Sequence, residues 1–116
     1  MSARLVDFDP TWIDYGERRR VGVRFRCLKH HCRGYLWIFF SNPLDGGPPV
    51  EGDAFSLMLE IAEQSGDREK FKYDRGCGRN RWHREGDTFE TLTMTPSVDA
   101  HRCGHATLTN GVFVYS

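Results

Sequence analysis

The 116-residue sequence contains no apolar run approaching the roughly 20 residues of a membrane-spanning helix. Its start, MSARLVDFDPTW, lacks the apolar stretch of a signal peptide, so a cytoplasmic location is expected. No internal repeat or long low-complexity tract is present. These absences favour a single globular domain over residues 1–116, with no membrane association, as a monomer or a small homo-oligomer.

Recognised catalytic signatures are also missing. The sequence has no H-E-x-x-H stretch, no G-x-S-x-G elbow and no P-loop, and it lacks the H-x-E…P-C-x-x-C pattern of zinc deaminases. A binding or structural role is therefore favoured over an enzyme. A zinc-dependent hydrolase stays open as an alternative, because Asp87 and Asp99 could each supply a general base.

The formal net charge is zero, with 16 basic and 16 acidic residues, but the charges are unevenly placed. Residues 68–84 are strongly basic, whereas the segment from Asp45 to Asp67 carries acidic residues and no basic ones. Aromatic residues are interleaved with the basic ones, a pattern that suits phosphate contact with base stacking. The nucleic-acid-binding candidates are Lys70, Lys72, Arg79, Arg81 and Trp82. The alternative, slightly favoured, is a solvated loop whose aromatic residues anchor to the core.

Hydrophobic periodicity predicts mostly strands. Residues 21–27 alternate, with Val23 and Phe25 on one face and Arg24 on the other, and the apolar run YLWIFF at 35–40 is typical of a buried strand. Further strands are expected around 70–73 and 89–95, the latter closed by Pro96. Residues 105–109 and 112–115 flank Asn-Gly, the dipeptide that favours a type I′ hairpin turn.

One helix is expected over 53–65, capped by Asp53 and stopped by Gly66, with Phe55, Met58, Leu59 and Ala62 on one face. A strand formed by the same apolar residues is the alternative. Residues 1–20 are predicted to form a loose or edge segment. The predicted fold is mainly β (α+β): a small antiparallel, zinc-stabilised β sandwich or barrel with one inserted helix and a C-terminal β-hairpin.

Cysteine and histidine gather in two clusters, Cys27-Leu-Lys-His30-His31-Cys32 and His101-Arg-Cys103-Gly-His105. Thiolate and imidazole are the ligands that zinc prefers, and two such clusters can share one tetrahedral ion. Cys103 and His105 are two residues apart, so on a strand they share a face. The preferred metal ligands are Cys27, Cys32, Cys103 and His105. His30 or His31 replacing a cysteine, or Cys77 joining the site, remain alternatives, since a lone cysteine or histidine is more often a core or surface residue.

The segments RWHREGDTFETLTMTPSVDA and CGHATLTNG, with the knuckle Cys27…Cys32 and FSNPLDGGPP, resemble a family of short proteins of unknown function common in phages and prophages. Some relatives occur beside bacterial ubiquitin-like conjugation genes, and some are misannotated as ammonia monooxygenase. The resemblance covers roughly residues 21–49 and 81–116, which leaves 50–80 as a probable insertion. It implies a zinc-binding β fold, with Cys103-x-His105 standing where some relatives have His-x-His.

Four available ligands, several of them thiolates, favour a closed structural zinc site over a catalytic one with an open position. The expected function is a small structural-zinc interaction module, an accessory protein of a phage or prophage that acts in the host cytoplasm through a macromolecular partner. A nucleic-acid-binding protein using residues 68–84 is the alternative within the binding class.

Overall fold

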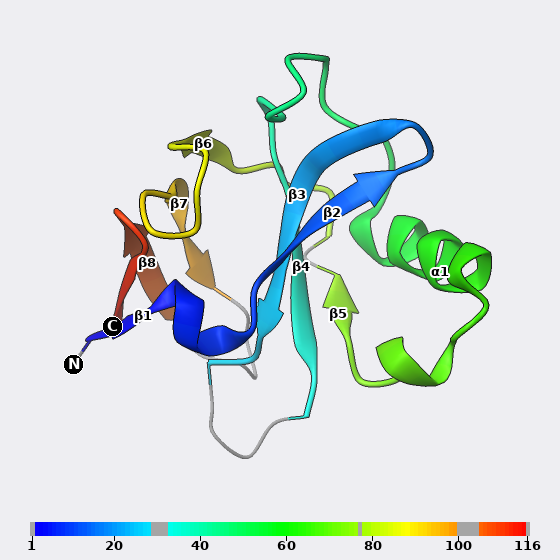
Figure 1. The fold of residues 1–116 in the computed structure, drawn as a ribbon, viewed down its shortest axis with the longest axis horizontal. Coiled ribbons are helices and arrows are strands. Elements are labelled where there is room, and N and C mark those ends of the chain that lie inside the picture. Colours follow the sequence, from blue (N-terminus) through cyan, green and yellow to red (C-terminus); the bar gives the residue numbers. More distant parts are fainter. Residues whose placement is uncertain (1, 29–32, 77, 100–104, 116) are drawn as a thin grey trace.

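The computed structural model describes residues 2–28, 33–76, 78–99 and 105–115. These residues form two β-sheets and one α-helix, so the mainly β prediction is confirmed (Figure 1). The described elements are β1 (Ser2–Arg4), η1 (Leu5–Phe8), β2 (Thr11–Tyr15), β3 (Arg18–Arg26), β4 (Tyr35–Phe39), α1 (Ala54–Ser65), η2 (Glu69–Phe71), β5 (Arg75–Gly76), β6 (His83–Glu85), β7 (Thr93–Asp99), β8 (His105–Thr109) and β9 (Val112–Tyr115).

The two sheets pack face to face. The first has the strand order β1-β9-β8-β7-β6 and is antiparallel, and the second has the order β2-β3-β4-β5, in which β5 joins β4 in parallel. Their shared core includes Val23, Phe25 and Ile38 from the second sheet and Leu108 and Phe113 from the first. α1 covers the opposite face of the second sheet, so the molecule has three layers (Figure 1).

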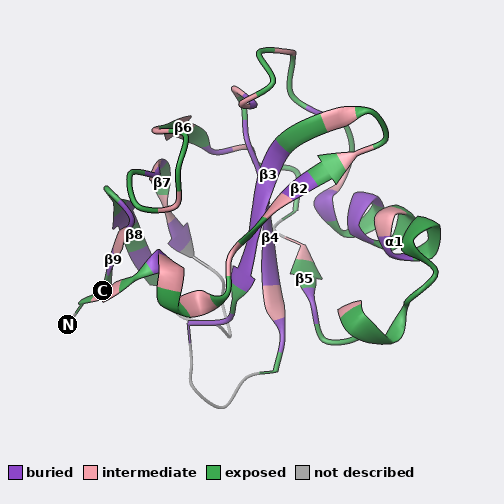
Figure 2. Cartoon of the chain, viewed as in Figure 1, coloured by how far each residue is buried: buried purple, intermediate pink, exposed green. Residues whose placement is uncertain are grey.

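β4 is buried on both faces because it lies in the middle layer. Leu36 and Ile38 belong to the core between the sheets, whereas Trp37 and Phe39 belong to the core beneath α1. This placement explains the unbroken apolar run YLWIFF, since a strand buried on both sides needs no polar alternation. Figure 2 shows β4 and the neighbouring part of β3 as the most continuously buried strands.

The helix forms where the sequence predicts it, but its buried face is different. Asp53 caps α1 by accepting a hydrogen bond from the Ser56 backbone N–H (3.2 Å), and Gly66 adopts the left-handed stop conformation with φ 75°. Ala54, Leu57, Met58 and Ala62 are the buried residues, whereas Phe55 and Leu59 are 52% and 42% exposed. The first turn packs directly on the backbone of Gly76, where a Cβ would meet the Phe55 nitrogen at 2.6 Å, and this contact fixes the helix rotation.

Of the two alternatives for residues 1–20, the structure shows the edge segment, because β1 and β2 are edge strands and Leu5 and Ile13 are buried. Two other local predictions need correction. The strand expected at 70–73 is the helical turn η2, and the strand lies further on, at β5. β7 continues through Pro96 to Asp99, with a register shift against β8 between Met94 and Val98 that accommodates the proline.

The C-terminal hairpin is confirmed. β8 and β9 pair from Ala106↔Tyr115 to Thr109↔Val112, and the two turn residues Asn110 and Gly111 have φ values of 48° and 73°. Both positive angles are what a type I′ turn requires. A Cβ at Gly111 would also lie 2.5 Å from the Phe89 carbonyl oxygen, so glycine is needed there for space as well.

Candidate functional site

Cys27 lies immediately beyond β3, at the end of the β3–β4 hairpin. Its backbone N–H donates to the Gly34 carbonyl (2.9 Å), so the two chain segments are still paired at this point. The residue is buried, at 2% exposure, in the core between the sheets. Cys32, the other proposed ligand of this cluster, lies outside the described residues.

His105 opens β8, at the end of the β7–β8 hairpin, and is exposed. It pairs in register with Asp99, and the neighbouring pair is Val98↔Ala106. Its Nε2 lies 2.7 Å from the Ser97 hydroxyl oxygen, a contact that fixes the ring orientation and leaves Nδ1 for another partner. Cys103 lies outside the described residues.

The described ends of the two hairpins meet in one hydrophobic cluster. Cys27 and Leu28 from the first hairpin and Val98 and Ala106 from the second all belong to the core between the sheets. In Figure 1, β3 and β7 both run toward the same edge of the molecule. β3 and β7 therefore end on the same side of the sandwich, with Cys27 directly after β3 and His105 at the start of β8.

The residues fit a zinc site in their donor chemistry. Cys27 offers a thiol in a dry environment, and His105 offers an imidazole whose other nitrogen already has a hydroxyl partner, the usual arrangement behind a metal-bound histidine. Within the described ranges no group of three or more histidine, cysteine or acidic side chains is arranged to hold a metal ion. His30, His31, Cys77 and His101 lie outside these ranges, whereas His83 lies on β6 and is exposed.

In the basic segment 68–84, two of the nucleic-acid-binding candidates, Arg81 and Trp82, are bound into the fold, and the burial of Trp82 agrees with the favoured alternative of aromatic residues anchored to the core. Trp82 is 5% exposed and belongs to the core between the sheets, so its ring is closed to a nucleic-acid base. The Arg81 guanidinium donates to backbone carbonyls, including those of Val50 (2.6 and 3.0 Å) and Gly52 (2.6 Å). Partial burial lowers its pKa. Both residues anchor the segment to the fold and are not available for a ligand, whereas Lys70, Lys72 and Arg79 are exposed.

Tyr73 is the aromatic residue of this segment that does face solvent. Its side chain is 48% exposed, and the Lys72 Nζ and the Arg33 Cζ lie 5.6 Å and 5.9 Å from the ring centroid. An open ring flanked by two cations can stack on a planar group while the cations contact phosphate. Tyr73, and not Trp82, is therefore the ring of this segment that a planar ligand could reach.

A buried ion pair joins the second sheet to the segment after α1. The Arg24 Nε donates to the Asp74 Oδ2 at 2.7 Å, and the Trp37 indole N–H donates to the same oxygen at 2.7 Å. The Arg24 guanidinium also lies 3.7 Å from the Tyr35 ring centroid. The alternation of residues 21–27 places Arg24 on the face of the strand opposite Val23 and Phe25, and does not predict that this face is buried too. The signal lies in the neighbouring strand, because Arg24 pairs with Trp37 of β4, a strand that is apolar throughout and buried on both faces.

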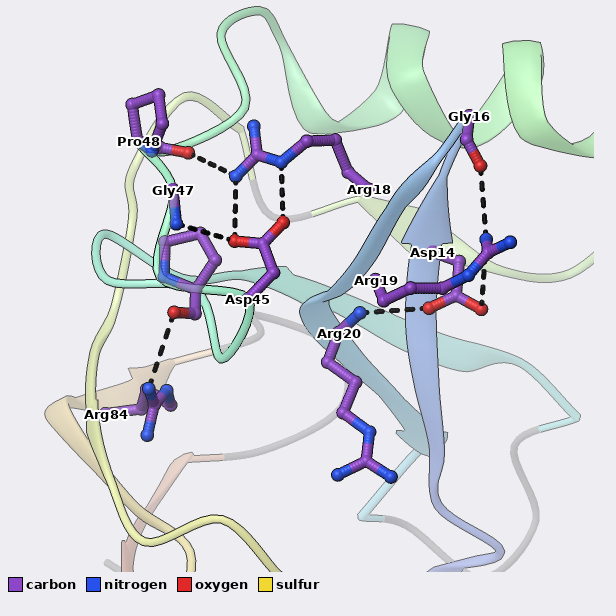
Figure 3. A network of polar contacts seen from close by, with 10 residues as sticks. Asp14, Gly16, Arg18, Arg19, Arg20, Asp45, Gly47, Pro48 and Arg84 are labelled. Carbon is purple, nitrogen blue, oxygen red and sulfur yellow. Dashed lines mark hydrogen bonds and ion pairs between the residues drawn. The ribbon is translucent and has the colours of Figure 1, made fainter.

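β3 begins with three consecutive arginines, Arg18 to Arg20, whose polar contacts are drawn in Figure 3. They lie beside a hollow of about 500 Å³ lined by Arg19, Arg20, Leu44, Asp45, Arg84 and Asp87. Arg18 forms a two-pronged ion pair with Asp45 (2.6 and 3.0 Å), and the Gly47 N–H donates to the same carboxylate. The Arg18 hydrogen bond, helped by the Gly47 N–H, lowers the pKa of Asp45 from 3.8 to about 2.

No helix among the described residues has the length and apolarity needed to cross a bilayer. Comparison of the chain with protein-family models, with characterised proteins and with solved structures finds no match.

Proposed function

We propose that this chain is a small metal-stabilised β module that binds a macromolecular partner. The observation that supports the proposal is that β3 and β7 run toward the same edge of the molecule, and that Cys27 and Ala106 at the two hairpins both belong to the core between the sheets. Cys27, Cys32, Cys103 and His105 would hold one Zn²⁺ there, which would link the two sheets at the end where the hairpins turn. In a phage or prophage setting the partner would be a host macromolecule.

A structural ion suits this molecule for a physical reason. The core is divided between two faces of the second sheet, so neither part is large, and metal ligation adds folding free energy that a small core lacks. His105 would bind through Nδ1, and the Ser97 hydroxyl would set the ring orientation from Nε2. The loops and α1 would remain available for a partner.

Metal analysis of purified protein tests the site. We expect about one zinc per chain in the wild type, and loss of zinc with partial or complete unfolding in Cys27→Ser and Cys103→Ser. Cys77→Ser is the matched control, because it removes a cysteine outside the proposed set, and it should retain the metal. Ser97→Ala should keep the fold and weaken zinc binding by roughly 10- to 100-fold.

Unchanged zinc content in both Cys27→Ser and Cys103→Ser would contradict the proposed ligand set. Zinc loss in the Cys77→Ser protein alone would assign the ligand to Cys77 instead. If the Cys27→Ser or Cys103→Ser protein kept its fold without zinc but lost a hydrolytic activity that the wild type has, the result would point to the hydrolase alternative.

A second candidate function is nucleic-acid binding through the exposed part of the basic segment. The observation that favours it is the Tyr73 ring with Lys72 and Arg33 beside it. Lys70 and Arg79 would add phosphate contacts from the same exposed stretch.

Titration of a single-stranded oligonucleotide at several salt concentrations tests this candidate. We expect affinity to fall steeply with salt and Tyr73→Ala to weaken binding by about tenfold, as loss of one stacked base does. Tyr15→Ala is a control, since Tyr15 lies on β2 and donates to Glu60 (2.9 Å) away from this segment. Binding that is undetectable at low salt would remove the candidate.

A further inference from the structure

Arg20 has a backbone conformation that arginine rarely adopts. Its φ is +52°, in the left-handed region, where a Cβ is unfavourable and glycine is the usual residue. The other described non-glycine residues with positive φ are Asp9 and Asn110, whose types tolerate this region. A long cationic side chain held there at a cost in strain indicates that the side chain itself is needed.

The strain arises at a bulge in the β2–β3 hairpin. Ile13 pairs with Gly22 and Tyr15 with Arg18, so Asp14 alone faces three residues of β3. The Asp14 carboxylate accepts a hydrogen bond from the Arg20 N–H at 2.9 Å, which fixes the bulge (Figure 3). Bulges of this kind redirect one side chain out of the strand pattern.

The redirected guanidinium lines the 500 Å³ hollow. Its Cζ lies 5.5 Å from the centroid of the Trp12 ring, which is itself stacked on Phe89 with the centroids 4.5 Å apart. Among the described residues the Arg20 guanidinium has no hydrogen-bond acceptor, and the residue is exposed beside the hollow. The aromatic pair supports the cation from behind and holds it in place.

The hollow has a surplus of positive charge. Three guanidinium groups line it against two carboxylates, and Asp45 is already neutralised by Arg18. The Arg84 guanidinium donates to the carbonyls of Asn42 (2.9 Å), Gly86 (3.0 Å) and Pro43 (3.4 Å), which anchors it beside the hollow. Arg19 donates to the Gly16 carbonyl (3.1 Å) and forms an ion pair with Asp14 (3.8 Å). Arg19 and Arg84 therefore already have partners, whereas the Arg20 guanidinium has no acceptor among the described residues.

We propose that this hollow, which we call the Arg20 hollow, binds a phosphate dianion, either free or as the monoester of a small hydroxylated molecule. The planar fork of arginine matches two oxygens of a phosphate, which gives a bidentate, charge-assisted contact. The volume exceeds that of a phosphate ion alone, and Asp87 at its edge can accept a hydrogen bond from a ligand hydroxyl. The site is separate from the hairpin ends and from Tyr73.

Titration of the full chain with inorganic phosphate and with ribose 5-phosphate, at constant ionic strength, tests the proposal. The indole N–H resonance of Trp12 is the readout, because Arg20 lies over that ring. We expect saturable binding and a loss of about tenfold in Arg20→Asn, the ratio expected for one lost charge-assisted contact. Asparagine tolerates the left-handed conformation, so this variant should keep its melting temperature within a few degrees.

Arg4→Gln is the matched control, because it removes one exposed positive charge from β1, in the other sheet. It should bind phosphate as the wild type does. Tighter binding of ribose 5-phosphate would assign the hollow to a monoester, and equal binding would assign it to free phosphate. Absence of saturable binding to the wild type, or equal weakening in Arg20→Asn and Arg4→Gln, would overturn the proposal.

Discussion

Asp74 and Asp45 each accept two hydrogen bonds from an arginine, but the two pairs lie in different surroundings. The Asp74 side chain is 1% exposed, whereas Asp45 lies at the surface beside the Arg20 hollow. Burial decides what each pair contributes, because an unpaired charge is costly only where water cannot reach it.

Removal of the Asp74 carboxylate should destabilise the protein strongly. In Asp74→Ala the Arg24 guanidinium and the Trp37 indole N–H both lose their acceptor inside the core, and we expect a loss of about 3–5 kcal/mol in the free energy of unfolding. Urea denaturation measures it. Asp7→Ala breaks an exposed ion pair with Arg4 and should cost less than about 1 kcal/mol. Equal losses in the two variants would contradict this assignment.

Asp45 should make stability depend on pH in the acid range. The pKa of Asp45 is about 2 in the folded protein and 3.8 when the carboxyl has no partners, as in the unfolded chain. The pair with Arg18 therefore stabilises the fold fully above about pH 4. As pH falls from about 4 to about 2, the unfolded chain binds a proton that the folded protein does not, and stability decreases. In Asp45→Asn this part of the pH dependence should disappear, as urea denaturation at a series of pH values would show. An identical pH profile in the two proteins would count against the Arg18–Asp45 pair.

At the scale of elements, α1 depends on its first turn. The Asp53 carboxylate satisfies the Ser56 N–H, and Asp53→Ala should reduce the free energy of unfolding by about 0.5–2 kcal/mol. Asp53→Asn, which preserves a capping oxygen, should stay close to wild type. Thermal unfolding followed by circular dichroism would measure both variants. A loss as large in Asp53→Asn as in Asp53→Ala would mean that charge rather than capping is important.

Capping and turn residues in the sequence correctly predicted the ends of α1 and the turn of the C-terminal hairpin. Asp53 and Gly66 bound the helix, and Asn110-Gly111 sets the final turn, since each acts through its own backbone angles or nearest hydrogen bonds. The rotation of α1 was not predictable, because it follows from the close approach of Gly76, a residue distant in sequence.

The candidate site was predictable only in part, for a similar reason. Periodicity placed Cys27 at the end of a strand and His105 at the start of another, and the structure puts both there. The burial of Trp82 and the bulge at Arg20 depend on how the two sheets and β2 pack, which no local pattern encodes.

At the scale of the whole molecule, Phe113 joins the two sheets. It lies on β9, is fully buried, and its ring centroid is 5.2 Å from that of Phe25 on β3 and 5.4 Å from that of Phe8 in η1. A side chain that packs against both sheets stabilises their contact with each other, so its loss destabilises the whole sandwich.

Phe113→Ala should therefore cost about 3–5 kcal/mol in the free energy of unfolding. Val114→Ala is the matched control, because the next residue faces solvent at 49% exposure and should change stability by less than about 1 kcal/mol. Chemical denaturation followed by tryptophan fluorescence would compare them. Similar losses in both would show that β9 contributes through its backbone pairing and not through the Phe113 ring.

The pairing of β1 with β9 determines how the protein responds to force. The two strands are antiparallel, and Ser2 lies opposite Val114, so the chain ends emerge together from one end of the ladder (Figure 1). Tension applied between the ends acts across the strands and not along them, and it loads the inter-strand hydrogen bonds one at a time. Such a module unzips under small loads, and tethers attached at both ends would open it from the Ser2↔Val114 pair inward.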